Sequence, residues 1–191
     1  MKKLLFNPFE KYDGRPVLTL GLLATLIGSL LGYALNARFD GVIDMHFSNN
    51  VIFAEPFTDN IFNIACLFFV LYLFGYFVNN KTRPIDILGI VMLARLPFYF
   101  GTLSNINGFM SSFGEKIMTA GPDITKIDPS EFLLPAVVAL ITLPFLVWYI
   151  ALLYNGFKTA TNLKTTMHKV LFAIAIVVAE VLSKILFYII Y

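Results

Sequence analysis

The sequence has little charge and few residues of the kinds that perform chemistry. Of its 191 residues, 14% are charged and 58% are hydrophobic, and the mean hydropathy is +0.78. A soluble domain carries about 25% charged residues. The shortage of charge, together with long uncharged runs, excludes an ordinary soluble domain and indicates a helical membrane protein. A net charge of only +2 gives no electrostatic support for nucleic-acid binding.

Cysteine and histidine are almost absent. The single cysteine, Cys66, excludes an intrachain disulfide and argues against a cysteine-based zinc site, so we interpret it as a small buried apolar residue. The sequence contains no H-E-x-x-H or G-x-S-x-G motif, and both histidines lie outside the apolar runs. We therefore expect a non-enzymatic protein with no catalytic residues, no cofactor and no bound metal.

Apolar runs are what the sequence has in abundance. A helix needs about 20 apolar residues to cross the hydrocarbon core of a bilayer. Five runs meet this length, and the predicted spans cover residues 16–35, 59–78, 85–104, 132–154 and 170–191. The first run is too long for a signal-peptide core and no A-x-A cleavage site follows it, so we expect it to be retained. The sequence predicts one all-α membrane domain over residues 1–191, a bundle of five transmembrane helices.

Basic residues are distributed unevenly between the two ends of these spans. Nine lysines and arginines lie before span one, after span two or after span four, whereas three lie in the segments on the opposite side. Cytoplasmic segments of membrane proteins carry the excess of lysine and arginine. We therefore predict a cytoplasmic N-terminus and a C-terminus on the outside.

Two longer connections carry their own patterns. Segment 36–60 mixes acidic and apolar residues, so we expect it to lie on the membrane surface as a short hairpin. Its Asp40, Asp44 and His46 have no spacing specific for a metal, and a solvated acidic loop is our interpretation. In segment 105–131, apolar residues recur at helical spacing from Phe109 to Met118, which predicts a short interfacial helix.

Small residues form a stripe along the first span. They recur at steps of four, three and four, and the last two make a G-x-x-x-G pair, which lets two helices approach closely. The stripe consists of Gly21, Thr25, Gly28 and Gly32. It predicts close contact either with another span of the same chain or with a second copy of the protein.

Prolines interrupt two of the spans. Pro97 lies in the middle of span three and Pro144 near the middle of span four. A proline inside a helix removes one backbone hydrogen bond and crowds the carbonyl four residues earlier. We therefore predict a kink at each of these two positions.

Three charged residues lie deep inside spans, away from their ends. Arg95 is near the middle of span three, where an arginine costs at least about 2.5–3.5 kcal/mol and needs a partner. Glu180 lies at the same depth in span five, so we predict that the two residues pair, with Lys184 joining them or reaching outward. Tyr99 and Thr102 share the helix face of Arg95 and add hydroxyl groups. The cluster is either a structural clasp between spans or an ion-coupling site.

Loose motifs in three places resemble those of the Yip (Ypt-interacting protein) family in its short prokaryotic form. The motifs are Asn7-Pro8-Phe9, Arg83-x-x-Asp86 leading to Ala94-x-x-Pro97, and Trp148 followed by Asn155-Gly156-Phe157 and Asn162-Leu163-Lys164. The resemblance implies five spans with a cytoplasmic N-terminus, here in a bacterial cytoplasmic membrane. It also implies a non-enzymatic protein that organises membrane or partner proteins, the partners being lipid, another membrane protein or a second copy.

Eukaryotic members of that family are linked to Rab-type GTPases and have a longer cytoplasmic N-terminal region. Because this sequence has no such region, we do not expect a GTPase partner. The alternative function is a small transporter or channel that uses Arg95, Glu180 and Lys184, although the five spans show no clear internal repeat of the kind common in transporters.

Overall fold

The computed structural model describes residues 5–12, 14–121 and 127–190, most of which are helical. Within these ranges, five helices are long and apolar enough to cross a membrane, which confirms the predicted all-α bundle. Four residues used in the predictions lie outside the described residues. They are Lys2, Lys3 and Lys126, which entered the charge count, and Tyr191, the last residue of the predicted fifth span.

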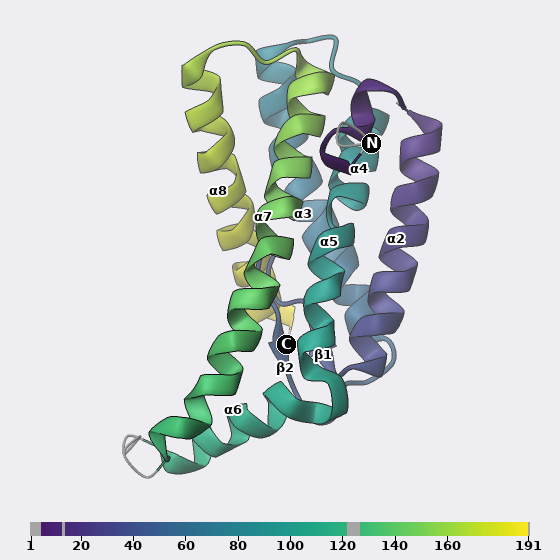
Figure 1. Cartoon of the computed structure of the whole chain (residues 1–191). Helices are drawn as coiled ribbons and strands as arrows, with labels where there is room; N and C mark the ends of the chain where they lie inside the picture. Colours follow the sequence, from purple (N-terminus) through teal and green to yellow (C-terminus); the bar gives the residue numbers. More distant parts are fainter. Residues whose placement is uncertain (1–4, 13, 122–126, 191) are drawn as a thin grey trace.

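The bundle is built from helices that run up and down beside one another (Figure 1). The first two spans are α2 (Arg15–Ala34) and α3 (Glu55–Val78), and a short 3₁₀ turn, η1 (Pro8–Glu10), precedes them. The third span consists of α4 (Pro84–Ala94), α5 (Leu96–Tyr99) and the 3₁₀ segment η2 (Phe100–Gly108). The last two are α7 (Leu133–Thr161), which follows the 3₁₀ turn η4 (Pro129–Phe132), and α8 (Thr166–Ile190).

Proline and asparagine mark the ends of several helices. Pro16, Pro56 and Pro84 each lie at one of the first two positions of a helix, where the missing N–H costs nothing. Asn36 and Asn162 adopt the left-handed conformation just after α2 and α7. Asparagine tolerates this conformation better than most residues, so it suits the end of a helix.

The third span lies at the centre of the bundle and is the most buried of the five. Its upper helix, α4, packs against α2, α7 and α3, whereas α8 lies at the edge and packs mainly against α3. The span is interrupted at Arg95, two residues before Pro97, so α4 and α5 are separate helices. Pro144 lies inside the continuous helix α7, whose lower half leans away from the bundle (Figure 1).

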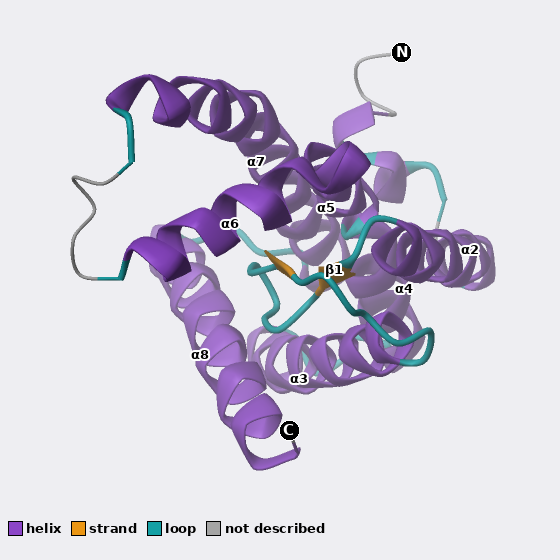
Figure 2. Cartoon of the chain, turned by 90° about the horizontal axis from the view of Figure 1, so that it is seen from below, coloured by secondary structure: helices purple, strands orange, loops and turns teal. Residues whose placement is uncertain are grey.

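The segment after α2 enters the bundle. Two short antiparallel strands, β1 (Ala37–Arg38) and β2 (His46–Phe47), form a hairpin in which Ala37 pairs with Phe47. We call residues 37–47 the inserted hairpin; viewed along the bundle, it lies among the helices (Figure 2). Phe39 and Val42 at its tip are fully buried. The expected hairpin is present, but its expected position on the membrane surface is wrong, because its apolar tip is buried in the core.

The predicted interfacial helix is present as α6 (Phe109–Ala120), which crosses one end of the bundle (Figure 1). The ring of Phe113 in α6 packs edge-on against the ring of Phe132, and Lys116 forms an ion pair with Glu131. These contacts tie α6 to the start of the fourth span.

The small-residue stripe of α2 faces other parts of the same chain. A Cβ atom on Gly21 would lie 2.7 Å from the Cβ of Met92, and one on Gly28 would lie 2.3 Å from the ring of Tyr99. Gly32 packs in the same way against Phe39 of the inserted hairpin. Thr25, the fourth member, donates its hydroxyl hydrogen bond to the carbonyl of Gly21 within α2.

We expect Gly28→Ala to lower the stability of the protein, because the added methyl group would overlap the ring of Tyr99. Overpacking of this kind costs about 1–3 kcal/mol. The matched control is Gly114→Ala in α6, where an added Cβ meets nothing within 4 Å. Thermal unfolding in detergent measures both variants. Equal melting temperatures for Gly28→Ala and the wild type would contradict the close contact between α2 and α5.

Candidate functional site: a charged clamp on the inserted hairpin

Arg95 lies at the break between α4 and α5 and is fully buried. Its guanidinium donates hydrogen bonds to the carbonyl oxygen of Val42 (2.8 Å), to Oδ1 of Asn60 (3.2 Å) and to the hydroxyl of Tyr99 (3.4 Å). The rings of Phe98, Tyr99 and Tyr149 lie 5.2–5.9 Å from the guanidinium carbon and add cation–π attraction. Each of the three guanidinium nitrogens therefore has a protein oxygen as its partner.

Glu180 of α8 approaches the same point of the hairpin from the other side. Its Oε2 accepts a hydrogen bond of 2.9 Å from the backbone N–H of Ile43. The carbonyl of Val42 and the N–H of Ile43 belong to one peptide group. Arg95 therefore holds the negative end of this peptide dipole, while Glu180 holds its positive end.

This arrangement corrects the predicted direct pair between Arg95 and Glu180. Among the described residues, the hydrogen bonds of Arg95 go to Val42, Asn60 and Tyr99, and Glu180 is not one of its partners. The two charges are coupled through the peptide between them, because the inserted hairpin occupies the space where a direct ion pair would form. Counting residues along the spans predicted that the two charges lie at the same level, and both do reach one peptide group, but it could not show what lies between them.

Two further side chains form hydrogen bonds with the hairpin tip. The hydroxyl of Tyr149 in α7 donates to the carbonyl of Val42 (3.2 Å), and the N–H of Val42 donates to Oγ of Ser183 in α8 (3.3 Å). A Cβ atom on Gly41 would lie 2.3 Å from Oε1 of Glu180, so a larger residue there would displace the Glu180 carboxylate. We call the set of groups that hold the backbone of Val42 and Ile43 the clamp: Arg95, Tyr149, Glu180 and Ser183.

A second charge pair fixes the base of the hairpin. Arg38 donates two hydrogen bonds to Asp59 in α3, from Nε to Oδ2 (2.7 Å) and from Nη2 to Oδ1 (2.9 Å), and its Nη1 lies 2.7 Å from Glu55. Asp59 is fully buried and also accepts the N–H of Phe39 (3.1 Å). Asn63, one turn further along α3, donates to the carbonyl of Phe39. Sequence reasoning missed this pair, although Asp59, Asn60 and Asn63 share one face of an apolar helix.

Lys184 joins a group of carboxylates at the exposed side of the hairpin. Its ammonium pairs with Asp44 and lies 3.8 Å from Asp40 and 3.9 Å from Glu180. Nδ1 of His46 lies 3.1 Å from Oδ2 of Asp40. Thr102, the remaining predicted member of the cluster, donates its hydroxyl hydrogen bond to the carbonyl of Tyr99, which lies in the same span.

The exposed group is electrostatically coupled. The hydrogen bond to Asp40 raises the pKa of His46, and it outweighs the opposite effect of burial. Burial would raise the pKa of Asp40, but the hydrogen bond with His46 and the charge of Lys184 lower it below its usual value. The carboxylates of the hairpin are therefore paired with nearby cations rather than gathered around an open space.

Because Arg95 and Glu180 act on one peptide group, we expect their effects on stability to be coupled. Arg95→Met leaves the buried oxygens of Val42 and Asn60 with fewer donors, which costs about 1–3 kcal/mol. Glu180→Gln keeps an acceptor for the N–H of Ile43 but removes the charge. A double-mutant cycle, measured by unfolding in detergent, should give an interaction energy of at least about 0.5 kcal/mol.

The control for this cycle is Lys184→Gln, because Lys184 is half-exposed and its ion pairs are worth less than about 1 kcal/mol. Additive effects of Arg95→Met and Glu180→Gln, or a loss in Lys184→Gln as large as that in Arg95→Met, would contradict the clamp.

Comparison with known proteins gives one finding. A protein-family model described as Yip1 domain matches residues 2–187. Searches of curated proteins and of solved structures found no match. The family match spans nearly the whole chain and covers four candidate membrane spans and most of the fifth. The chain therefore belongs to the Yip1-domain family and is an integral membrane protein.

Proposed function

We propose that this protein is a non-enzymatic organiser of membrane or partner proteins, and that its buried charges are a structural clasp. The observation that carries the proposal is the environment of Arg95, which is fully buried and each of whose three side-chain nitrogens donates a hydrogen bond to a protein oxygen. Family membership supports the same function. The proposal includes the bacterial cytoplasmic membrane as location and the basic end of the bundle as its cytoplasmic side.

An ion-conducting role for the cluster would need groups that water or a proton can reach. Arg95, Val42 and Tyr149 are each fully buried, so no water-sized space adjoins the centre of the clamp. An arginine does not release its proton in a protein, so Arg95 cannot serve as a proton carrier. The carboxylate of Glu180 is engaged with the N–H of Ile43. These features favour the clasp over the small transporter or channel.

As a structural clasp, the clamp would hold α8 in one position, and so determine which face of α8 is exposed. It holds α8 to the inserted hairpin through Glu180 and Ser183, while α8 packs mainly against α3. One stripe of α8 remains exposed, with Val177, Val181 and Ile185 each at least half accessible. A stripe of this kind faces lipid or a helix of another membrane protein, so its position would determine which partners fit.

The first test is a flux assay. Purified protein is reconstituted into liposomes that contain a pH-sensitive dye, and a potassium diffusion potential is imposed. We expect proton flux equal to that of protein-free liposomes for the wild type and for Glu180→Gln, because Arg95, Val42 and Tyr149 are fully buried and leave no path past Glu180 through the bundle. Flux in the wild type that Glu180→Gln abolishes would overturn the organiser proposal and establish transport.

The second test asks whether α8 meets a defined partner. A photo-reactive amino acid replaces Val181, and the control position is Leu23, which is equally exposed on α2 at the opposite side of the bundle. After irradiation of intact membranes, we expect discrete adducts from position 181 that are absent from position 23. The adducts should fall several-fold when Arg95→Met is added, because the clamp positions α8.

Adducts at both positions with the same pattern would indicate random collisions in the membrane and would contradict a defined partner surface. Adducts from position 181 that persist unchanged in the Arg95→Met variant would show that the clamp does not position α8.

A further inference from the structure

His46 is an accessible histidine at the hairpin end of the bundle. It lies in β2 opposite Arg38 of β1, and 54% of its side chain is exposed. Helix α2 ends at Ala34 and α3 begins at Glu55, so the base of the inserted hairpin lies at the ends of these spans (Figure 2). Histidine is the side chain whose charge ordinarily changes between about pH 5 and 8. A group that titrates near neutral pH is therefore open to protons at this end.

His46 is connected to α8 through Asp40. Nδ1 of His46 lies 3.1 Å from Oδ2 of Asp40, and the same oxygen lies 3.8 Å from the ammonium of Lys184 in α8. This ammonium also pairs with Asp44 and lies 3.9 Å from Oε1 of Glu180, a member of the clamp. A chain of charged groups thus joins the exposed histidine to the contact between the hairpin and α8.

The balance of charge in this chain depends on the proton of His46. Its three carboxylates are those of Asp40, Asp44 and Glu180. They face two cations when His46 is protonated, but only Lys184 when it is neutral. Neutral imidazole can still donate from Nδ1, so the hydrogen bond persists while the charge is lost. The hairpin carboxylates then repel Glu180 of α8 with less compensation.

The other charged side chains around the hairpin are already engaged. They come from β1, α3, α6 and the turn before α7, whereas the part of α7 that faces the hairpin presents apolar and hydroxyl side chains. The engaged groups are Arg38 with Glu55 and Asp59, Lys116 with Glu131, and Glu115 with Asn49. Among the described residues, these groups therefore have partners other than the carboxylates that His46 and Lys184 compensate.

The direction of the pH dependence follows from the two hairpin groups. The hydrogen bond with Asp40 raises the pKa of His46 above its usual value of about 6.5, although burial and the charge of Arg38 oppose this. Its contribution is therefore complete below about pH 6.5 and is lost as the pH rises through the raised pKa. Burial acts to raise the pKa of Asp40, but the hydrogen bond with His46 lowers it below about 4, so the contribution of Asp40 is lost only in stronger acid.

We propose that His46 is a pH-sensitive switch on the contact between the inserted hairpin and α8. Protonated His46 neutralises Asp40 and leaves Lys184 to hold Asp44 and Glu180, so α8 stays close to the hairpin. Loss of the proton weakens this contact. The proposal deepens the proposed structural clasp, on which it rests, by giving it a regulator. On the topology predicted from the basic residues, this end faces the outside, so the switch responds to external pH.

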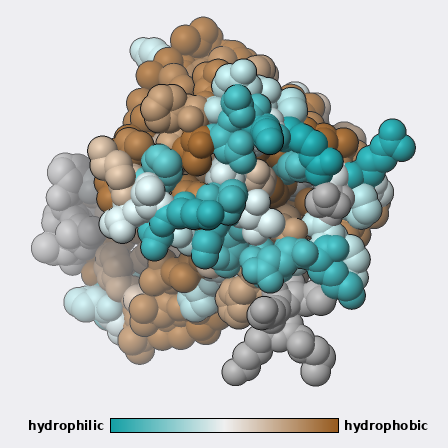
Figure 3. Space-filling model, turned by 90° about the horizontal axis from the view of Figure 1, so that it is seen from above, coloured by the Kyte–Doolittle hydropathy of each residue, from teal (hydrophilic) through white to brown (hydrophobic). Residues whose placement is uncertain are grey.

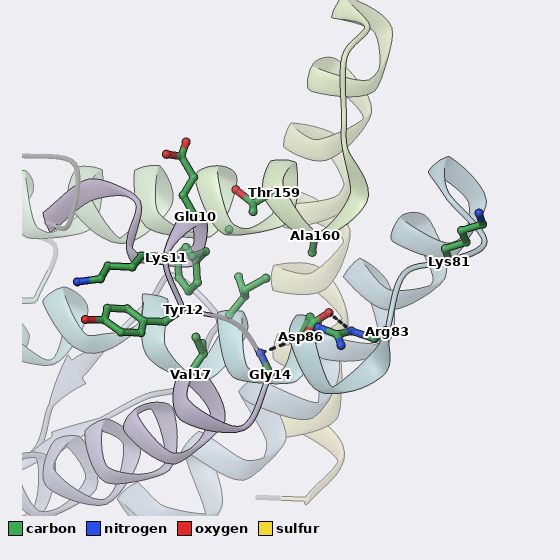
Figure 4. A pocket seen from close by; sticks show the side chains of 13 residues that line it. Glu10, Lys11, Tyr12, Gly14, Val17, Lys81, Arg83, Asp86, Thr159 and Ala160 are labelled. Carbon is green, nitrogen blue, oxygen red and sulfur yellow. Dashed lines mark hydrogen bonds and ion pairs between the residues drawn. The ribbon is translucent and has the colours of Figure 1, made fainter.

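The opposite end of the bundle provides a control. Hydrophilic residues run across its face (Figure 3), and a pocket of about 500 Å³ opens there (Figure 4). Asp86 at this pocket accepts hydrogen bonds from the N–H of Gly14 and from Nε of Arg83, and the described residues that line it include no histidine. The other histidine of the sequence, His168, lies in the first turn of α8 at this end, and its ring packs edge-on against Phe74.

The test follows hydrogen exchange of the full-length protein in detergent, by mass spectrometry of peptides that cover residues 40–47. It compares about pH 5.5 with about pH 8.5, on either side of the histidine titration, and each rate is divided by the intrinsic exchange rate at that pH. We expect protection in the wild type to fall about two- to fivefold at the higher pH, as befits partly exposed ion pairs. In His46→Gln, which is neutral throughout, protection should be low at both pH values.

His168→Gln should keep the pH dependence of the wild type. The same pH dependence in His46→Gln as in the wild type, or its loss in His168→Gln, would overturn the switch. Asp40→Asn supplies a second variant, since it removes the carboxylate that pairs with His46 and should also reduce the pH dependence.

Arg95→Met separates the switch from the clasp, because it should lower protection at both pH values. Unchanged protection in Arg95→Met would contradict the clasp itself. Equal protection of the wild type at the two pH values, together with a loss in Arg95→Met, would overturn the switch and leave the clasp standing.

Discussion

The half of the bundle that contains the inserted hairpin depends on one peptide group held between two opposite charges. The Val42 carbonyl faces Arg95, and the Ile43 N–H faces Glu180. Hydrogen bonds to charged groups contribute about 1.5–3 kcal/mol each. The interposed peptide lets both charges be satisfied without contact, and it joins the third span, the fifth span and the inserted hairpin at one point.

Several polar residues inside the spans share one role, because they form hydrogen bonds with the backbone of the inserted hairpin. Backbone outside a helix or barrel is tolerated at membrane depth only when protein or water meets its hydrogen bonds. Here Asp59 and Asn63 form hydrogen bonds with the backbone of Phe39. Ser183 and Arg95 form them with the backbone of Val42, and Glu180 with that of Ile43. Residues that look like a transport pathway in the sequence are therefore also what a buried hairpin requires.

The two ends of the bundle are built differently. At the hairpin end, opposite charges are paired, with Arg95 and Asp59 buried and Lys184 and Asp44 half-exposed. At the basic end, the motif residues Phe9, Arg83, Asp86 and Gly156 surround an open pocket whose lysines have no carboxylate partner among the described residues. The stripe of Gly21, Gly28 and Gly32 connects these ends, because it lets α2 lie close to α4, α5 and the hairpin along its length.

The sequence alone determined the fold class, the five spans and the break near Pro97, because hydrophobic length and proline act locally along the chain. Its short motifs also indicated the family. It also placed Arg95 and Glu180 at matching depths. Only the tertiary structure decided that the hairpin inserts between them and that Asn60, Asp59 and Tyr149 meet it. Residue spacing gives depth along a span, whereas the partner of a buried charge depends on which segment fills the space between helices.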